Sequence, residues 1–160
     1  MFNKMCYALN RKNKNKLNLS KKQDNPAPKL LFRKDLEEYD FDFKNMLGWQ
    51  NYPNYCYATI IDNKIVSCAS AGYHADSISC KIVGISTITH KDYRGKGYSV
   101  SNVVALCEYI LNMQEEKIIH YLTDNKNIAS QKTALAAGLM KVSYCYIVLN
   151  HLKYRVFTRT

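Results

Sequence analysis

The sequence lacks several features that would assign a protein to a class directly. No window of 18 apolar residues occurs in the 160-residue chain, so we expect no transmembrane helix and no membrane partner. The basic N-terminus contains no apolar core of the kind found in signal peptides, and we therefore expect a cytoplasmic protein. None of the six cysteines belongs to a C-x-x-C pair, which argues against a zinc site and against a thioredoxin-type site. We expect no metal, and we expect the cysteines to be small buried thiols.

Acidic residues are almost absent from the first part of the chain. Residues 1–34 contain ten Lys or Arg and one acidic residue, whereas residues 35–160 contain 13 basic and 12 acidic residues. A Pro-containing boundary then predicts a basic, flexible leader over residues 1–28, in which residues 5–9 could form an edge strand, and a single domain over residues 29–160. The leader could bind nucleic acid or an acidic partner. We favour a solvated segment, because it has few aromatic side chains that could stack on bases.

A strand, a basic loop with two glycines and a helix follow one another in the middle of the chain. Residues 79–89 are rich in β-branched side chains, which predicts a strand. In the loop, Gly95 and Gly97 allow the backbone to turn tightly, and the free amides of the helix N-terminus favour an anion beside Arg94 and Lys96. The order therefore predicts a phosphate-binding turn in an α/β domain. The helix is predicted from apolar residues at helical spacing: Val100, Val103, Val104, Cys107, Ile110 and Leu111.

Two common nucleotide-binding motifs do not fit this loop. The string G-x-x-x-x-G-K-[ST] of the nucleotide P-loop does not occur in the sequence. The dinucleotide fingerprint needs a third glycine after Gly95 and Gly97, and that place is unfilled. The third interpretation is the pyrophosphate loop R-G-x-G-x-[GA] of coenzyme A acyltransferases. Its six positions are Arg94, Gly95, Lys96, Gly97, Tyr98 and Ser99, with a small serine at the last one.

With this loop, the chain resembles the GNAT family of N-acetyltransferases. The resemblance covers about two-thirds of the chain and includes a second motif, in which residues 123–130 and 134–139 are similar to the family's N-x-x-[AS] … G-[FL] segment. It implies acetyl-CoA as the cofactor, with the pyrophosphate on residues 94–99. It further implies that Asn127 and Ser130 face the pantetheine arm, although Asn127 could simply cap a helix and Ser130 could be an ordinary first-turn serine. The arm would pair with the backbone of the strand before the loop, at Thr87, Ile88 and Thr89.

The remaining segments complete an order of elements that matches the core of the family. The predicted sequence of elements is β-β-β-α-β-α-β-β, an α/β domain of the α+β type with a mixed, mainly antiparallel sheet flanked by helices. The strand at 117–122 should run parallel to the strand at 79–89, because a helix crosses between them. An additional helix that begins with acidic residues is predicted at 35–47. The second helix is predicted at 128–137, and the other strands are predicted at 55–61, 65–70, 140–149 and 154–158.

The resemblance implies an N-acyltransferase that moves an acetyl group from acetyl-CoA to a small-molecule or peptide amine by direct transfer in a ternary complex. Many members carry a tyrosine seven positions after the equivalent of Asn127, as the acid for the departing thiolate, and here that position is Ala134. His90 and Tyr144 are candidate bases, although a loop histidine and a packing tyrosine are the ordinary alternatives. Two other functions stay open: a noncatalytic acyl-CoA-binding module, and a nucleic-acid-associated protein that acts through its leader. A homodimer also stays open.

Overall fold

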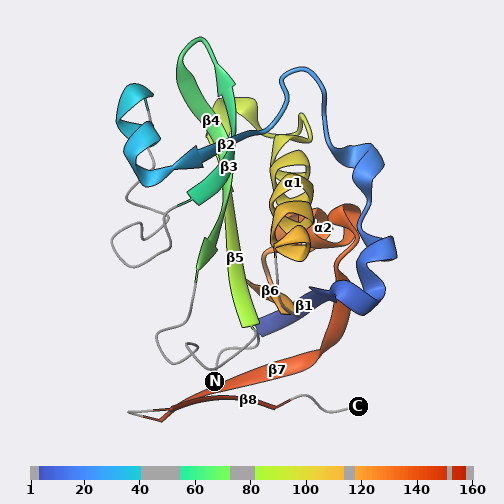
Figure 1. The fold of residues 1–160 in the computed structure, drawn as a ribbon. Helices are drawn as coiled ribbons and strands as arrows, with labels where there is room; N and C mark the ends of the chain where they lie inside the picture. Colours follow the sequence, from blue (N-terminus) through green and yellow to red (C-terminus); the bar gives the residue numbers. More distant parts are fainter. Residues whose placement is uncertain (1–3, 41–54, 73–81, 114–117, 151–152, 158–160) are drawn as a thin grey trace.

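One eight-stranded sheet, with strand order β2-β3-β4-β5-β6-β1-β7-β8, forms the centre of the molecule (Figure 1). The computed structural model describes residues 4–40, 55–72, 82–113, 118–150 and 153–157, and its side chains through residue 142. Neighbouring strands are antiparallel except for β5 and β6, which are parallel. The strands are β1 (Lys4–Asn10), β2 (Lys29–Phe32), β3 (Tyr55–Ile61), β4 (Lys64–Gly72), β5 (Ile82–Thr89), β6 (Ile118–Asp124), β7 (Met140–Asn150) and β8 (Lys153–Phe157).

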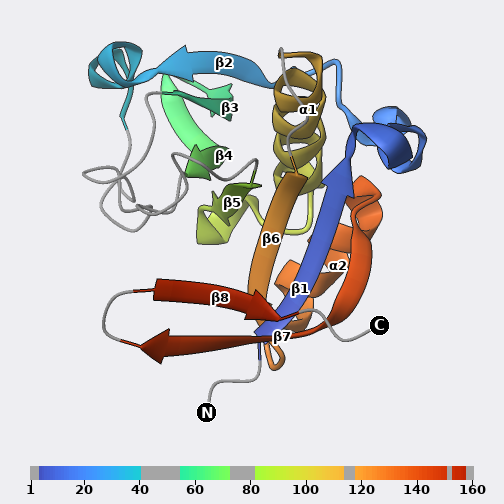
Figure 2. The ribbon, with the colours of Figure 1, turned by 60° about the horizontal axis from the view of Figure 1, so that its bottom comes forward.

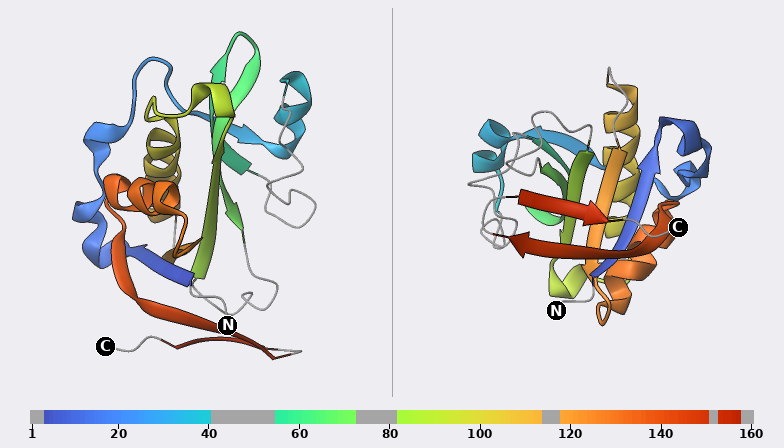
Figure 3. Two further views of the ribbon diagram at one scale, coloured as in Figure 1. Left: turned by 180° about the vertical axis from the view of Figure 1, so that it is seen from behind. Right: turned by 90° about the horizontal axis from the view of Figure 1, so that it is seen from below.

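Two α-helices, α1 (Tyr98–Asn112) and α2 (Ile128–Ala137), cover one face of this sheet (Figures 1 and 3). The main core lies between them and the strands. It takes Val83 and Ile85 from β5, and Ile119 and Tyr121 from β6, because alternate side chains of a strand point to the same face. Most of the helical stripe predicted from spacing is buried in this core, at Val103, Val104, Cys107, Ile110 and Leu111, and Val100 packs against it partly buried.

The predicted order of strands and α-helices is confirmed from β3 to β8, and the strands β1 and β2 precede it. The strand at 55–61 and the helix at 128–137 have the predicted bounds, and β6 runs parallel to β5. The connection between β3 and β4 is a tight hairpin whose two loop residues, Asp62 and Asn63, have φ of 48° and 60°. Asp and Asn tolerate this left-handed conformation better than most residues, which fits a two-residue hairpin turn.

The prediction of a helix at 35–47 is wrong for residues 35–40, the part of it that the structure describes. The chain forms a short 3-10 helix, η3 (Arg33–Glu38), and then a β-bridge from Asp40 to Lys64. The carboxylate of Asp35 accepts a hydrogen bond from the backbone N–H of Phe32 at 2.7 Å, so it caps the turn instead of opening a longer helix. Residues 41–54 lie outside the described residues.

The prediction of a leader separate from the domain is wrong for residues 4–22. β1 is an interior strand between β6 and β7, not an edge strand (Figure 2). Its residues Met5, Tyr7 and Leu9 are buried in the main core. The chain then continues as two 3-10 helices, η1 (Arg11–Lys16), which lies against β1, and η2 (Leu19–Lys21), which lies against α1 and α2. A boundary at residue 28 therefore does not separate a tail from the fold.

This N-terminal segment makes specific contacts with α1 and α2. The backbone N–H of Asn18 donates to the carbonyl of Ala137 at the end of α2, at 3.0 Å. The Lys22 ammonium lies 2.7 Å from the Glu108 carboxylate on α1. The side chain of Gln23 donates from Nε2 to the carbonyl of Lys96 at 2.8 Å. The segment thus connects the end of α2 to α1 and to the loop before it.

Candidate functional site

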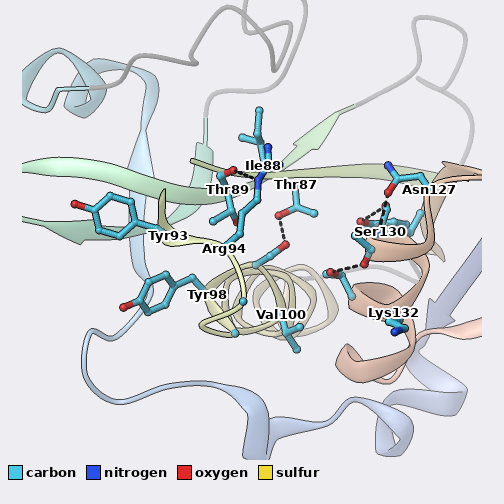
Figure 4. A pocket seen from close by; sticks show the side chains of 16 residues that line it. Thr87, Ile88, Thr89, Tyr93, Arg94, Tyr98, Val100, Asn127, Ser130 and Lys132 are labelled. Atoms are coloured by element: carbon cyan, nitrogen blue, oxygen red, sulfur yellow. Dashed lines mark hydrogen bonds between the residues drawn. The ribbon is translucent and has the colours of Figure 1, made fainter. Parts of the chain in front are cut away.

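The site is a pocket of about 440 Å³ that opens where β5 and β6 separate (Figure 4). The parallel ladder between these strands ends at the pair Ile85–Tyr121. Beyond that point β5 stays paired with β4 up to Thr89, and β6 stays paired with β1 up to Asp124. Each strand is therefore held on its outer side, and the space between their diverging ends is available to a ligand.

Most of the residues predicted to bind a cofactor meet in this pocket. The exception is Lys96, whose ammonium lies 5.0 Å from the centre of the Tyr93 ring and does not line the pocket. Two motifs that are separated in the sequence, the basic loop and the start of α2, thus form opposite sides of one cavity. The predicted residues that line it are Thr87, Ile88, Thr89, Arg94, Gly95, Gly97, Tyr98, Ser99, Asn127 and Ser130.

The loop has the backbone conformation that its glycines allow. Gly95 has φ of +77° and Gly97 has φ of +81°, a left-handed region in which a Cβ is strained. Gly97 immediately precedes α1, and the first bond of the helix runs from the N–H of Ser101 to the carbonyl of Gly97 at 3.0 Å. The three amides before Ser101 have no carbonyl one turn earlier in the helix, so they and the helix dipole favour an anion at the pocket.

Two side chains fix the loop and the first turn of α1 to the strands. Arg94 donates from Nε to the carbonyl of Thr89 at 3.2 Å, which holds the guanidinium beside the end of β5. The Thr87 hydroxyl donates to the carbonyl of Cys68 at 3.0 Å. It therefore accepts from the hydroxyl of Ser99, which lies 2.9 Å away. These bonds join β4, β5 and α1 at the wall of the pocket.

The opposite wall is the N-terminal part of α2. Asn127 caps this helix, because its Oδ1 accepts from the backbone N–H of Ser130 at 3.1 Å. In the described part of the chain no acceptor engages Nδ2 of Asn127, so capping and ligand binding are compatible in one side chain. The hydroxyl of Ser130 lies 2.7 Å from the hydroxyl of Tyr121 on β6.

Six further residues line the pocket that the sequence did not assign to the site: Val100, Ala129, Thr133 and the three titratable residues Tyr93, Tyr121 and Lys132. Tyr93 and Lys132 flank the two motifs and are visible at opposite sides of the cavity in Figure 4. Tyr121 is only 2% exposed, and burial raises the pKa of its hydroxyl, an effect that the hydrogen bond with Ser130 opposes. The alternation of β6 places Tyr121 on the helix-covered face, but it does not reveal that the ladder with β5 ends there.

Of the two candidate bases, His90 does not line the pocket, and Tyr144 stays a prediction. His90 follows β5, with Nδ1 at 3.4 Å from the backbone N of Asp92 and 3.6 Å from its carboxylate, and it does not line the cavity. Tyr144 belongs to β7, and its side chain lies outside the described residues. Ala134 is fully buried, so its position contributes no acid to the pocket.

The four cysteines whose side chains the structure describes have the buried positions expected of structural thiols. Cys6, Cys56, Cys68 and Cys107 are buried and free of disulfides. Burial raises the pKa of Cys56 to about 12 and raises the pKa of Cys68 and Cys107 as well, so these thiols are poor nucleophiles at neutral pH. Among the described residues, no group of three His, Cys, Asp or Glu side chains could hold a metal ion, and no helix is long and apolar enough to cross a membrane.

Solved structures provide an independent comparison for this architecture. The GCN5-related N-acetyltransferase-like protein of Streptococcus suis is 18% identical, with a TM-score of 0.57, and the match covers 88% of this chain and 59% of that one. A GNAT-family protein of Novosphingobium aromaticivorans is 12% identical with a TM-score of 0.57, and the match covers 88% of this chain and 61% of that one. An acetyltransferase from the GNAT family of Colwellia psychrerythraea is also 12% identical, with a TM-score of 0.56 and coverage of 88% and 53%.

The chain has the GNAT fold. It spans less than two-thirds of the length of these three GNAT proteins. No protein-family model and no curated protein sequence matches the chain. The identities of 12–18% establish the arrangement of the GNAT elements, and the chemistry must be argued from the pocket of this chain.

Proposed function

We propose that this protein is an acyl-CoA-dependent N-acyltransferase that moves an acetyl group from acetyl-CoA to an amine by direct transfer in a ternary complex. The observation that carries the proposal is the meeting of the glycine loop, the outer half of β5 and the start of α2 in one pocket. These are the segments that the sequence resemblance assigns to the pyrophosphate and to the pantetheine arm. Their convergence supports the assignment, because the motifs lie about 30 residues apart in the chain.

The residues of the pocket fit the chemical groups of coenzyme A. The amides at the start of α1 and the guanidinium of Arg94 suit a pyrophosphate, and the left-handed glycines keep side-chain atoms away from it. Nδ2 of Asn127 suits an amide carbonyl of the pantetheine arm. The edge of β5 beyond the end of the ladder has backbone groups that can pair with an extended arm.

Acetyl-CoA supplies an activated acyl group as a thioester. The protein's part is to hold the acyl carbon near an incoming amine, to donate a hydrogen bond to the acyl oxygen and to provide a path for one proton. A backbone N–H of residues 87–89 is our candidate donor to the acyl oxygen. The amine loses its proton to water in this proposal, because neither His90 nor Ala134 supplies a base or acid to the pocket.

A noncatalytic acyl-CoA-binding module is the second candidate function. Two observations favour it: Ala134 replaces the tyrosine of many GNAT proteins, and His90 lies away from the pocket lining. Both candidates require the same ligand, so cofactor binding alone does not distinguish them. Turnover does, because only the transferase releases free thiol when an amine is present.

The test has two stages. Calorimetry first measures the affinity of the full chain for acetyl-CoA, with ATP and NAD as ligands of the two excluded motifs. We expect binding of acetyl-CoA alone, and absence of binding would refute both the transferase and the acyl-CoA module. A panel of amines with thiol release as the readout then follows. Acyl transfer to any amine supports the transferase, whereas binding without turnover across the panel favours the module.

A further inference from the structure

Tyr121 lies at the point where β5 and β6 separate. It pairs with Ile85 as the last pair of the parallel ladder, and it lines the pocket on the helix-covered face. The glycine loop begins beyond Thr89, four residues further along β5, at the other end of the same cavity. Four extended residues span roughly 13 Å. The pocket therefore has a phosphate end at the loop and an inner end at Tyr121.

The pantetheine arm is long enough to extend from the loop end of the pocket to the inner end. Between the pyrophosphate and the sulfur the arm has about twelve bonds, as many as the backbone of about four residues. An arm that starts at the loop and runs back along Thr89 and Thr87 reaches the region of Ile85 and Tyr121 with its sulfur. This step rests on the proposed function, because it assumes that the loop binds the pyrophosphate.

The hydroxyl of Tyr121 is held in place at this inner end. It lies 2.7 Å from the hydroxyl of Ser130, whose backbone N–H is fixed by Oδ1 of Asn127. The ring packs edge-on against Tyr7, with centroids 6.4 Å apart and planes at 83°. A tyrosine hydroxyl can accept one hydrogen bond and donate another. Either hydroxyl could donate in the bond between Tyr121 and Ser130, and in the arrangement in which Ser130 donates, Tyr121 keeps its own proton for an atom in the pocket.

The other titratable side chains that line the pocket are placed differently. Tyr93, Arg94 and Tyr98 belong to the loop and the start of α1, and Lys132 is an exposed residue of α2. Among the described lining residues, Tyr121 is the buried hydroxyl acid at the inner end. Burial also raises its pKa, so the hydroxyl keeps its proton at neutral pH.

We propose that Tyr121 donates the proton to the departing thiolate of coenzyme A, and that Ser130 positions its hydroxyl. The nitrogen of the amine forms a bond to the acyl carbon while the carbon–sulfur bond breaks and its electron pair moves to sulfur. The tyrosine proton then passes to sulfur. The surplus proton of the amine returns to Tyr121 through water and Ser130. The products are an amide and a free thiol, and no other reactant is needed.

The test uses coenzyme A itself and needs no acceptor. A hydroxyl that donates to the thiolate lowers the thiol pKa of bound coenzyme A below its free value of about 8.5, so the affinity for coenzyme A must rise with pH. Calorimetry between pH 6 and pH 9.5 measures this rise, and acetyl-CoA, which has no ionisable thiol, corrects for all other titrations. For the native chain we expect the affinity for coenzyme A, relative to that for acetyl-CoA, to increase about tenfold over this pH range.

Two variants and a matched control complete the test. Tyr121→Phe keeps the ring that packs against Tyr7, and we expect it to abolish the tenfold gain while acetyl-CoA still binds. Ser130→Ala keeps the tyrosine and should reduce the gain, which provides a second readout if Tyr121→Phe does not fold. Tyr109→Phe is the control: Tyr109 packs against Tyr55 and Tyr57 outside the pocket lining, and its loss of a hydroxyl should leave the gain unchanged.

Each outcome separates this inference from the proposed function. If the native chain does not bind coenzyme A or acetyl-CoA, both are refuted. If the native chain binds both ligands but its affinity for coenzyme A does not rise with pH relative to acetyl-CoA, Tyr121 is not the donor and the proposed function stands. The same conclusion follows if the affinity rises equally in the native chain and in the folded Tyr121→Phe and Ser130→Ala variants. Once an acceptor is known, Tyr121→Phe should lower kcat about 100-fold with little change in KM, and an unchanged kcat would also overturn the role of Tyr121.

Discussion

A negative charge placed at Gly95 tests the anion site most directly. A Cβ at Gly95 has no atom within 4 Å, so a new side chain enters open space beside the pocket, although φ of +77° strains any residue other than glycine. Gly95→Glu and Gly95→Gln have nearly the same size and share that strain, about 1–2 kcal/mol. The two variants differ in one charge. Gly97 is a poorer choice, because its Cβ would lie 3.0 Å from Nε2 of Gln23.

The expected size of the charge effect follows from Coulomb's law. A carboxylate about 4 Å from one phosphate charge is repelled by about 1 kcal/mol in bulk water and about 4 kcal/mol at the effective dielectric of a protein surface. Gly95→Glu should therefore bind acetyl-CoA about 5- to 1,000-fold more weakly than Gly95→Gln, and the difference should shrink in about 1 M salt. Calorimetry on both folded variants measures it. Equal affinities would refute the placement of the phosphates at this loop.

Two further predictions concern stability. Gly138→Ala should lower the free energy of unfolding by more than the about 1–2 kcal/mol of backbone strain at φ of +93°, because a Cβ there would also lie 1.9 Å from the carbonyl oxygen of Lys16. Denaturant unfolding measures this loss. A loss of only about 1–2 kcal/mol would mean that the backbone at Lys16 moves away at little cost. The buried thiols of Cys56, Cys68 and Cys107 should make stability fall above about pH 8.5, since the unfolded chain loses these protons while the native chain keeps them. The expected slope is about 1.4 kcal/mol per thiol and pH unit, and a flat profile up to pH 10 would contradict the raised pKa values.

The segments that could be predicted from the sequence are those with a local signal. The β-branched run before the loop, the apolar spacing of α1 and the residues Asn127 and Gly138 at the ends of α2 each specify a conformation within a few residues. These signals were enough for the order of the elements. They were also enough for most of the pocket lining, because the loop and the start of α2 both follow strands that run in the same direction.

The missed features depend on contacts between distant parts of the chain. A strand at residues 5–9 was predicted only at the edge of the sheet, because the partners β6 and β7 that make β1 an interior strand lie more than 100 residues away. The ammonium of Lys96 lies over the ring of Tyr93, a local contact that the charge of the loop does not reveal, and the role of Lys96 in phosphate binding stays a prediction. Tyr121 was missed because the alternation of a strand indicates a face, whereas the end of a ladder is a property of two strands.

The corrected position of the N-terminal segment changes the interpretation of the charge. Residues 1–34 carry most of the net charge of +10, and much of that segment is folded against the two helices whose first turns line the pocket. Gln23 contacts the carbonyl of Lys96 inside the glycine loop, and Asn18 contacts the end of α2. The basic residues therefore belong to the unit that we propose binds an anionic cofactor. An excess of positive charge there favours encounter with a polyphosphate before any contact is made, so the charge need not imply a nucleic-acid partner.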